Sequence, residues 1–207
     1  GVSAFKTAVV SAVLGAAVFF ALLIPFSIDR GFGWIFELYY NTLSSYPYAT
    51  LNAPNLYGML GGNGVSVDQT FMGISYSVWS FIFIIAICVI SALVYFKVGD
   101  GIFAAGAVLV SGMYVLAAKM HERYIFPVFA LLLLFEICSK KKYPAIVCMA
   151  FSLTTFAASV KVLDLSISGQ SPWIAPNEVW FIAISAVNVL MFILMIYMML
   201  RERKYEK

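Results

Sequence analysis

The chain has 207 residues, of which 63% are hydrophobic and only 11% are charged. So apolar a composition excludes an ordinary water-soluble domain, which could not bury this much apolar surface, and it indicates a polytopic membrane protein. The net charge of +3 excludes little, because in membrane proteins the placement of Lys and Arg is more informative than their sum.

The N-terminus is typical of a piece of a longer protein. The chain begins with Gly-Val-Ser-Ala and not with Met, and its first apolar run continues into an aromatic-rich segment without a cleavage-like end. We therefore expect residues 1–207 to be the C-terminal membrane domain of a larger protein, with the N-terminal remainder of the same protein as its partner.

Six apolar runs approach or exceed the length of about 20 residues that a helix needs to cross a bilayer. We expect the fold class to be all-α, a polytopic transmembrane helical bundle of about six spans in the lipid bilayer. The predicted spans are residues 7–27, 74–96, 102–118, 124–138, 144–163 and 178–200.

The basic residues predict the orientation of these spans. Nine of the thirteen Lys and Arg residues fall on one side of the predicted topology, and the positive-inside rule makes that side cytoplasmic. Both ends of the chain are then expected in the cytoplasm. The nine residues are Lys6, Lys97, Lys140, Lys141, Lys142, Arg201, Arg203, Lys204 and Lys207.

The external loop of residues 28–73 is rich in aromatic residues, which prefer the membrane interface. It predicts a short helix at Trp34–Leu43 on the outer surface and a second, re-entrant or interfacial helix at Ala49–Leu60. Polar groups in the second segment, those of Asn52, Asn55 and Tyr57, are candidates for contacts with a sugar. The alternative is an aromatic belt with polar helix ends.

A charged cluster follows the third span, where Lys119, His121, Glu122 and Arg123 lie within five positions and include the only histidine. Two of these residues are basic and lie on the external side, against the charge bias. The adjoining runs are also short, so their junction is expected below the outer surface, in a recess surrounded by protein.

An anion site is the function that this cluster predicts. If residues 119–123 continue the third helix, Lys119 and Arg123 share one face, whereas His121 and Tyr124 share another. Arg matches phosphate oxygens with a planar fork, Lys adds a point charge, His donates a hydrogen bond or a proton, and Glu122 orients its neighbours. The alternative is that these residues only end two helices, with the cations reaching the headgroups.

Two stretches resemble a known family. KMHERYIFP, residues 119–127, resembles the "MHERYLFP" signature of bacterial C-type integral-membrane glycosyltransferases, which are related to mannosyltransferases of GPI-anchor assembly. YPYATLNAPNLYGMLGGN, residues 46–63, resembles that family's upstream "YPYATVNAFNLWALLG" stretch. The two stretches cover part of the chain directly, and Pro54 departs from the large residue usual at its position.

The resemblance implies transfer of a hexose, mannose by preference, from a polyprenyl-phosphate carrier to an acceptor at the outer face of a bacterial plasma membrane. Such enzymes carry their catalytic carboxylate in an N-terminal external loop, which implies a base upstream of Gly1 and a fragment that is inactive alone. Should the comparison mislead, Asp29, Glu37 and Asp68 are alternative bases.

The sequence contains few motifs that indicate other classes of binding site. No Cys/His spacing predicts zinc, no basic-aromatic pattern predicts nucleic acid and no cofactor motif is evident, whereas a need for a divalent metal stays open. Lys161 and Asp164 have the spacing of an intrahelical ion pair. The rival function is part of a transporter for an anionic or lipid-linked substrate, whose site would lie near the bilayer centre.

Overall fold

The computed structural model describes residues 2–98 and 101–201. The chain divides into two compact units, residues 1–46 and 47–207. In the first unit, α1 (Val2–Ser27) is followed by α2 (Gly33–Ser44), which confirms the helix predicted at Trp34–Leu43. The indole nitrogen of Trp34 donates a hydrogen bond to Ser27 Oγ over 2.9 Å, so the turn between the two helices is closed by side chains.

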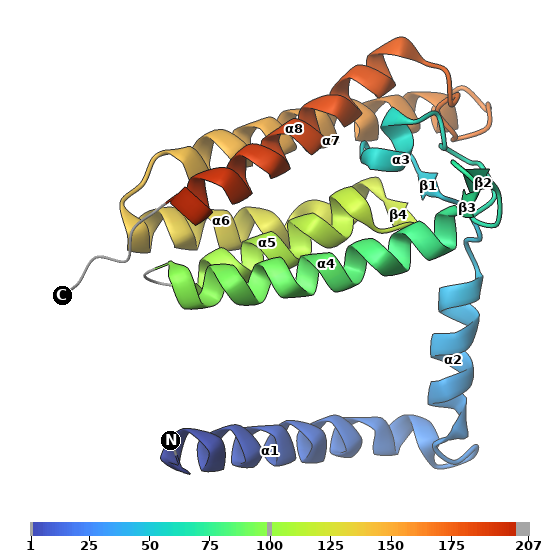
Figure 1. The fold of residues 1–207 in the computed structure, drawn as a ribbon. Coiled ribbons are helices and arrows are strands. Elements are labelled where there is room, and N and C mark those ends of the chain that lie inside the picture. Colours follow the sequence, from blue (N-terminus) through green and yellow to red (C-terminus); the bar gives the residue numbers. More distant parts are fainter. Residues whose placement is uncertain (1, 99–100, 202–207) are drawn as a thin grey trace. The chain divides into compact units, whose positions relative to one another are not determined.

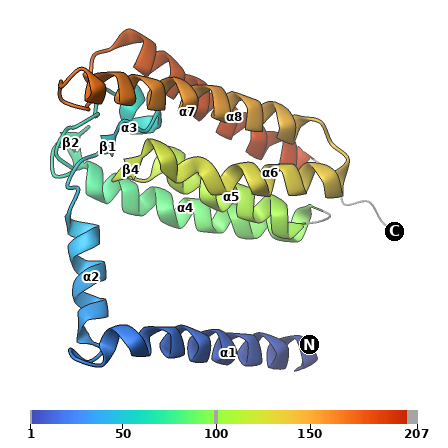
Figure 2. The same ribbon diagram turned by 180° about the vertical axis from the view of Figure 1, so that it is seen from behind.

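The described part of the second unit is built on five helices of 14 to 25 residues, which Figures 1 and 2 show side by side. Each packs against its neighbours in the chain, and α8 closes the group by packing against α5. The buried apolar core between them includes Val108, Leu132, Phe151 and Met195. The five helices are α4 (Tyr76–Lys97), α5 (Gly101–Leu116), α6 (Phe126–Ser139), α7 (Tyr143–Ile167) and α8 (Val179–Arg201).

The predicted class is confirmed, because the described residues are mostly helical, with almost no sheet, and strongly apolar. Four helices, α1, α4, α7 and α8, are long and apolar enough to cross a membrane. The other two predicted spans are the shorter α5, of 16 residues, and α6, of 14 residues. The protein is therefore an integral membrane protein with an all-α bundle.

Basic residues gather at one end of this bundle. Lys97 ends α4, Lys140–Lys142 connect α6 with α7, and Arg201 ends α8. The loops 47–75, 117–125 and 168–178 meet at the opposite end (Figure 1). The predicted cytoplasmic residues Arg203, Lys204 and Lys207 lie outside the described residues.

The helix predicted at Ala49–Leu60 is wrong over most of its length. The segment contains β1 (Thr50–Leu51) and only one helical turn, α3 (Leu56–Met59). Asn52 has a left-handed backbone with φ of 57°, and Pro54 disfavours helical geometry at Ala53 before it. These two positions break the helix. Farther along, β2 (Thr70–Phe71) and β3 (Ile74–Ser75) form a short antiparallel hairpin.

The segment nevertheless enters the bundle, as a loop. Ala53 is fully buried among the helices, and the amide of Asn188 on α8 donates a hydrogen bond to the Pro54 carbonyl over 2.7 Å. Thr154 on α7 donates to Asn188 Oδ1 over 2.7 Å. Because Asn188 lies about 14 Å along α8 from Val179, the loop reaches well below the helix end. Irregular backbone at this depth is tolerated because protein surrounds it.

The helical arrangement predicted for residues 119–123 is also wrong. α5 ends at Leu116, Lys119 is left-handed with φ of 63°, and an extended pair, β4 (Met120–His121), precedes a 3-10 turn, η1 (Glu122–Ile125). The Lys119 amide donates to the Ala49 carbonyl over 3.1 Å, outside any helical ladder. The helical face proposed to join Lys119 with Arg123 therefore does not exist.

Candidate functional site

The two stretches that carry the family resemblance meet in space. β1 and β4 pair in parallel, with Thr50 beside Met120 and Leu51 beside His121. The Thr50 hydroxyl donates to the Met120 carbonyl over 3.3 Å, across 70 positions of sequence. The non-helical backbone of both segments makes this pairing possible, because it frees N–H and C=O groups that a helix would have used internally.

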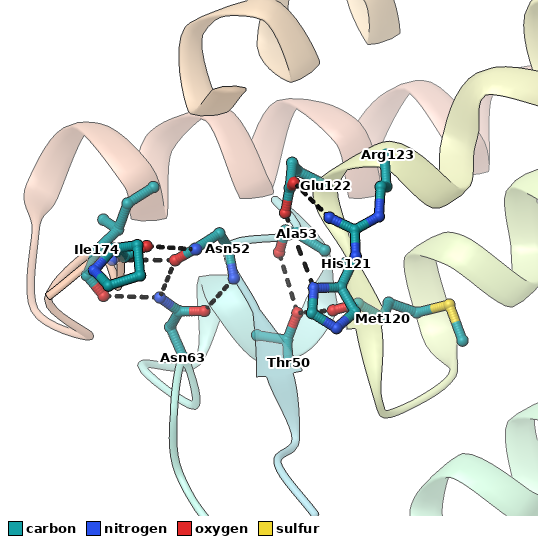
Figure 3. A network of polar contacts seen from close by, with 10 residues as sticks. Thr50, Asn52, Ala53, Asn63, Met120, His121, Glu122, Arg123 and Ile174 are labelled. Atoms are coloured by element: carbon teal, nitrogen blue, oxygen red, sulfur yellow. Dashed lines mark hydrogen bonds and ion pairs between the residues drawn. The ribbon is translucent and has the colours of Figure 1, made fainter. Parts of the chain in front are cut away.

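Beside this pairing, Asn52 and Asn63 form an asparagine clamp (Figure 3). The Asn52 amide N–H donates to Asn63 Oδ1 over 2.6 Å, and Asn63 Nδ2 donates to Asn52 Oδ1 over 3.1 Å. Both side chains are buried, with exposed fractions of 5% and 2%. The clamp fixes the backbone of the loop where it approaches β4.

The clamp also holds the loop between α7 and α8, which the sequence reading did not connect to the site. Asn52 Oδ1 accepts from the Ile174 amide over 2.9 Å, and Asn63 Nδ2 donates to the Ile174 carbonyl over 2.6 Å. Trp173 packs edge-on against Tyr48, with ring centroids 5.0 Å apart. An apolar Trp173-Ile174 pair within a polar loop was the signal that this loop is anchored.

We call the four residues Lys119, His121, Glu122 and Arg123 the cationic cluster. Its members differ in solvent exposure. His121 is buried, with an exposed fraction of 8%, and Lys119 is half-buried. The side chains of Glu122 and Arg123 are 12% and 57% exposed. Arg123 Nη1 lies 3.5 Å from Glu122 Oε1, and His121 Nδ1 lies 4.0 Å from Glu122 Oε2 (Figure 3). Glu122 thus lies between a buried imidazole and an exposed guanidinium.

Tyr124 completes this surface. Its ring packs edge-on against His121 with centroids 5.2 Å apart, and the Arg123 guanidinium carbon lies 5.9 Å from the ring centroid. The predicted neighbourhood of His121 and Tyr124 is therefore present, although a 3-10 turn and not an α-helix produces it. The guanidinium is placed by a carboxylate and an aromatic ring while most of its surface faces outward.

The imidazole of His121 is kept neutral by its surroundings. Burial lowers the pKa of His121 from its ordinary value, the positive charge of Arg123 lowers it further, and Glu122 opposes both. A neutral imidazole can donate from one nitrogen and accept at the other. At neutral pH His121 therefore acts as a hydrogen-bonding group, and the positive charge of the cluster comes from Lys119 and Arg123.

Three residues were predicted to contact a sugar, namely Asn52, Asn55 and Tyr57. Their side chains are buried and make contacts within the protein. Asn55 Oδ1 caps α3 by accepting from the Gly58 amide over 3.0 Å. Tyr57 packs against Tyr76 with ring centroids 5.4 Å apart, and burial raises the pKa of its phenol. The exposed fractions of the three residues are 5%, 0% and 1%, so in this structure they offer no surface to a sugar.

The remaining candidates belong to other segments of the chain. Lys161 Nζ lies 3.2 Å from Asp164 Oδ2, which confirms the predicted ion pair on α7. Asp68 is an exposed residue of the loop before β2, and Asp29 and Glu37 are exposed residues of the first unit. Within residues 2–98 and 101–201, no three His, Cys, Asp or Glu side chains gather closely enough to hold a metal ion.

Three comparisons bear on the identity of the chain. A scan against protein-family models, a search of curated proteins and a search of solved structures find nothing that matches it.

Proposed function

We propose that this chain is the membrane part of a glycosyltransferase that takes a hexose from a polyprenyl-phosphate carrier, and that its cationic cluster binds the carrier phosphate. One observation carries the proposal. The stretches 46–63 and 119–127, which resemble two motifs of that enzyme class, are paired through β1 and β4 at one end of the bundle. Lys119 lies directly before β4, and Arg123 lies two residues after it.

The chemistry of the cluster suits a departing phosphate. Arg123 offers a planar set of donors to phosphate oxygens, Lys119 adds a compact charge, and neutral His121 adds a hydrogen bond. In the transfer, the bond from the anomeric carbon of the sugar to the phosphate oxygen breaks. The acceptor oxygen bonds to that carbon and loses its proton to a carboxylate, while positive charge stabilises the leaving phosphate.

This chain supplies the second of these tasks. Glu122 is the carboxylate of the cluster, but its contacts with His121 and Arg123 suit it to positioning those groups. We assign the catalytic base to a carboxylate outside the cationic cluster. Mannose is the hexose that the resemblance favours.

The placement of charge suits a site at the outer face. Lys97, Lys140–Lys142 and Arg201 lie at the end of the bundle away from the cluster, and the positive-inside rule assigns such an end to the cytoplasm. We therefore assign both ends of this chain to the cytoplasm, and the family resemblance favours a bacterial plasma membrane. A site near one end of the helices suits transfer better than transport, which uses a midplane site.

The test is a transfer assay with the full-length protein in lipid vesicles, given a polyprenyl-phosphate mannose and an acceptor alcohol. Arg123→Gln and Lys119→Gln remove one charge each and should each slow transfer by roughly tenfold or more. Lys161→Gln, a cation of an exposed ion pair on α7, is the matched control and should leave the rate unchanged.

Two outcomes contradict the proposal. One is equal transfer by the wild type and both cluster variants. The other is movement of the intact lipid-linked sugar across the vesicle membrane without transfer to the acceptor, which would make the protein a transporter.

A further inference from the structure

An apolar cavity of about 240 Å³ lies between α3, the β2–β3 hairpin and the first two turns of α4. Its wall is apolar throughout, and none of the four residues of the cationic cluster contributes to it. Tyr57 and Tyr76 line it together with Leu56, Leu60, Phe71, Met72, Trp79 and Phe83.

The walls of the cavity are held in place by contacts among the lining residues. The Trp79 indole donates to the Phe71 carbonyl over 3.0 Å, which ties the hairpin to α4. The rings of Trp79 and Phe83 stack with centroids 5.7 Å apart, at 21°. Tyr57, which is 1% exposed, is packed against Tyr76. The cavity is therefore formed before any ligand enters.

The cavity lies beside exposed apolar side chains of α4. α4 is one of the helices long and apolar enough to span the membrane. Its neighbouring side chains Phe81 and Ile82 are 65% and 43% exposed, and at the cavity Leu60 and Met72 are 37% and 80% exposed. Trp79 lies in the first turn of this span, where tryptophan marks the membrane interface. Acyl chains of the bilayer therefore reach the cavity without crossing water.

We propose that this cavity binds part of one acyl chain of a membrane phospholipid. An apolar cavity of roughly 150 Å³ stays dry and accepts benzene, so one of 240 Å³ has room for a longer piece of hydrocarbon. It is smaller than the roughly 300–1,000 Å³ usual for sites of drug-sized ligands, and its apolar wall excludes a sugar or a phosphate.

A phospholipid is the occupant that the surroundings favour. Phospholipid chains are the bulk component on the open side of the cavity, and its lining offers no cation that would select a phosphate-linked isoprenoid. The bound chain stabilises α3 and the hairpin against α4, and so supports the loop that carries β1 to the site. This proposal does not rest on the glycosyltransferase proposal.

The test is photo-crosslinking of the full-length protein in nanodiscs of phosphatidylethanolamine and phosphatidylglycerol, with a diazirine near the end of one acyl chain. Labelled residues are identified by mass spectrometry. Phe156 of α7, 69% exposed, reports labelling by bulk lipid. Labelling at the cavity residues Leu56, Tyr57, Phe71 and Tyr76 should exceed that at Phe156.

Leu60→Trp fills the opening. It should lower labelling of the cavity by roughly tenfold, because about two methylene groups of the acyl chain can no longer be buried there. Labelling at Phe156 should not change. Phe81→Trp, on the lipid side of α4, is the matched control and should leave cavity labelling as in the wild type. If Leu60→Trp does not fold, Met72→Trp tests the same opening from the exposed hairpin.

Three outcomes overturn the proposal. The first is cavity labelling no higher than that at Phe156, or unchanged by the filling variant. The second is loss of the label on addition of polyprenyl phosphate, which would assign the cavity to the isoprenoid chain. The third is a crosslink to residues 1–46 of the same chain when a photo-reactive amino acid replaces Leu60. A failed transfer assay changes none of these measurements.

Discussion

The asparagine clamp and the cationic cluster lie at the same end of the bundle, yet they treat their polar groups in opposite ways. Asn52 and Asn63 are 5% and 2% exposed, and their amides bond within the protein. Arg123 is 57% exposed and contacts its carboxylate at the long distance of 3.5 Å. The clamp uses polarity to hold three segments together, whereas the cluster presents charge to the outside.

This difference separates stability from binding. A buried amide that loses its partner costs about 1–3 kcal/mol, because the remaining donor or acceptor cannot reach water. An exposed ion pair adds about 0–1 kcal/mol. Substitutions in the clamp should therefore change unfolding, and substitutions in the cluster should change ligand affinity.

The largest effect on stability is expected for Asn63→Ala. The substitution leaves the Asn52 amide N–H, Asn52 Oδ1 and the Ile174 carbonyl each without one hydrogen bond, so the free energy of unfolding should fall by about 2–3 kcal/mol. Thermal unfolding in detergent measures it. The exposed Asn177 gives the control Asn177→Ala, and an equal small loss in both variants would show that the clamp does not hold the loops.

A smaller effect is expected for Asn188→Ala in the middle of α8. Its side chain bonds Thr154 and the Pro54 carbonyl inside the bundle, and polar contacts between membrane helices contribute about 0.6 kcal/mol on average and up to about 1.7 kcal/mol. We expect a loss of about 1 kcal/mol in the same unfolding measurement. Leu190→Ala, on an exposed side of α8, is the control, and no difference between the two variants would contradict the anchoring of Pro54.

The smallest effect is expected from acid acting on His121. Because burial and Arg123 lower its pKa in the folded protein, the unfolded chain takes up this proton first as pH falls below about 6.5. The free energy of unfolding should keep its full value above that pH. It should decline as the pH falls towards the lower pKa that His121 has in the folded protein. His121→Gln should flatten this part of the stability curve. Parallel curves for the two proteins would contradict a neutral, buried imidazole.

The helices were largely predictable from the sequence, because each apolar run is long and uninterrupted. The run 74–96 corresponds to α4 at Tyr76–Lys97, and 178–200 corresponds to α8 at Val179–Arg201. The turns were not predictable, because local propensity does not specify which residue takes a left-handed backbone, as Asn52 and Lys119 do. Both wrong predictions of helix fall at these two positions.

The charged segment was predictable from the sequence, but its construction was not. Charge placement and the single histidine indicated residues 119–124, where the structure shows contacts of Glu122 with His121 and Arg123. The pairing of β1 with β4 joins two-residue strands 70 positions apart, and strands so short have no periodicity to read. The clamp was missed for the same reason, because its partner Ile174 comes from a distant loop.

The most direct test of the proposed phosphate site is the equilibrium affinity of the full-length protein for a polyprenyl phosphate. Arg123→Ala should bind roughly 10- to 100-fold more weakly than the wild type, the loss expected for hydrogen bonds to a charged group. It should unfold at the same temperature, and Lys161→Ala should bind normally. Equal affinity of Arg123→Ala and the wild type would contradict the account.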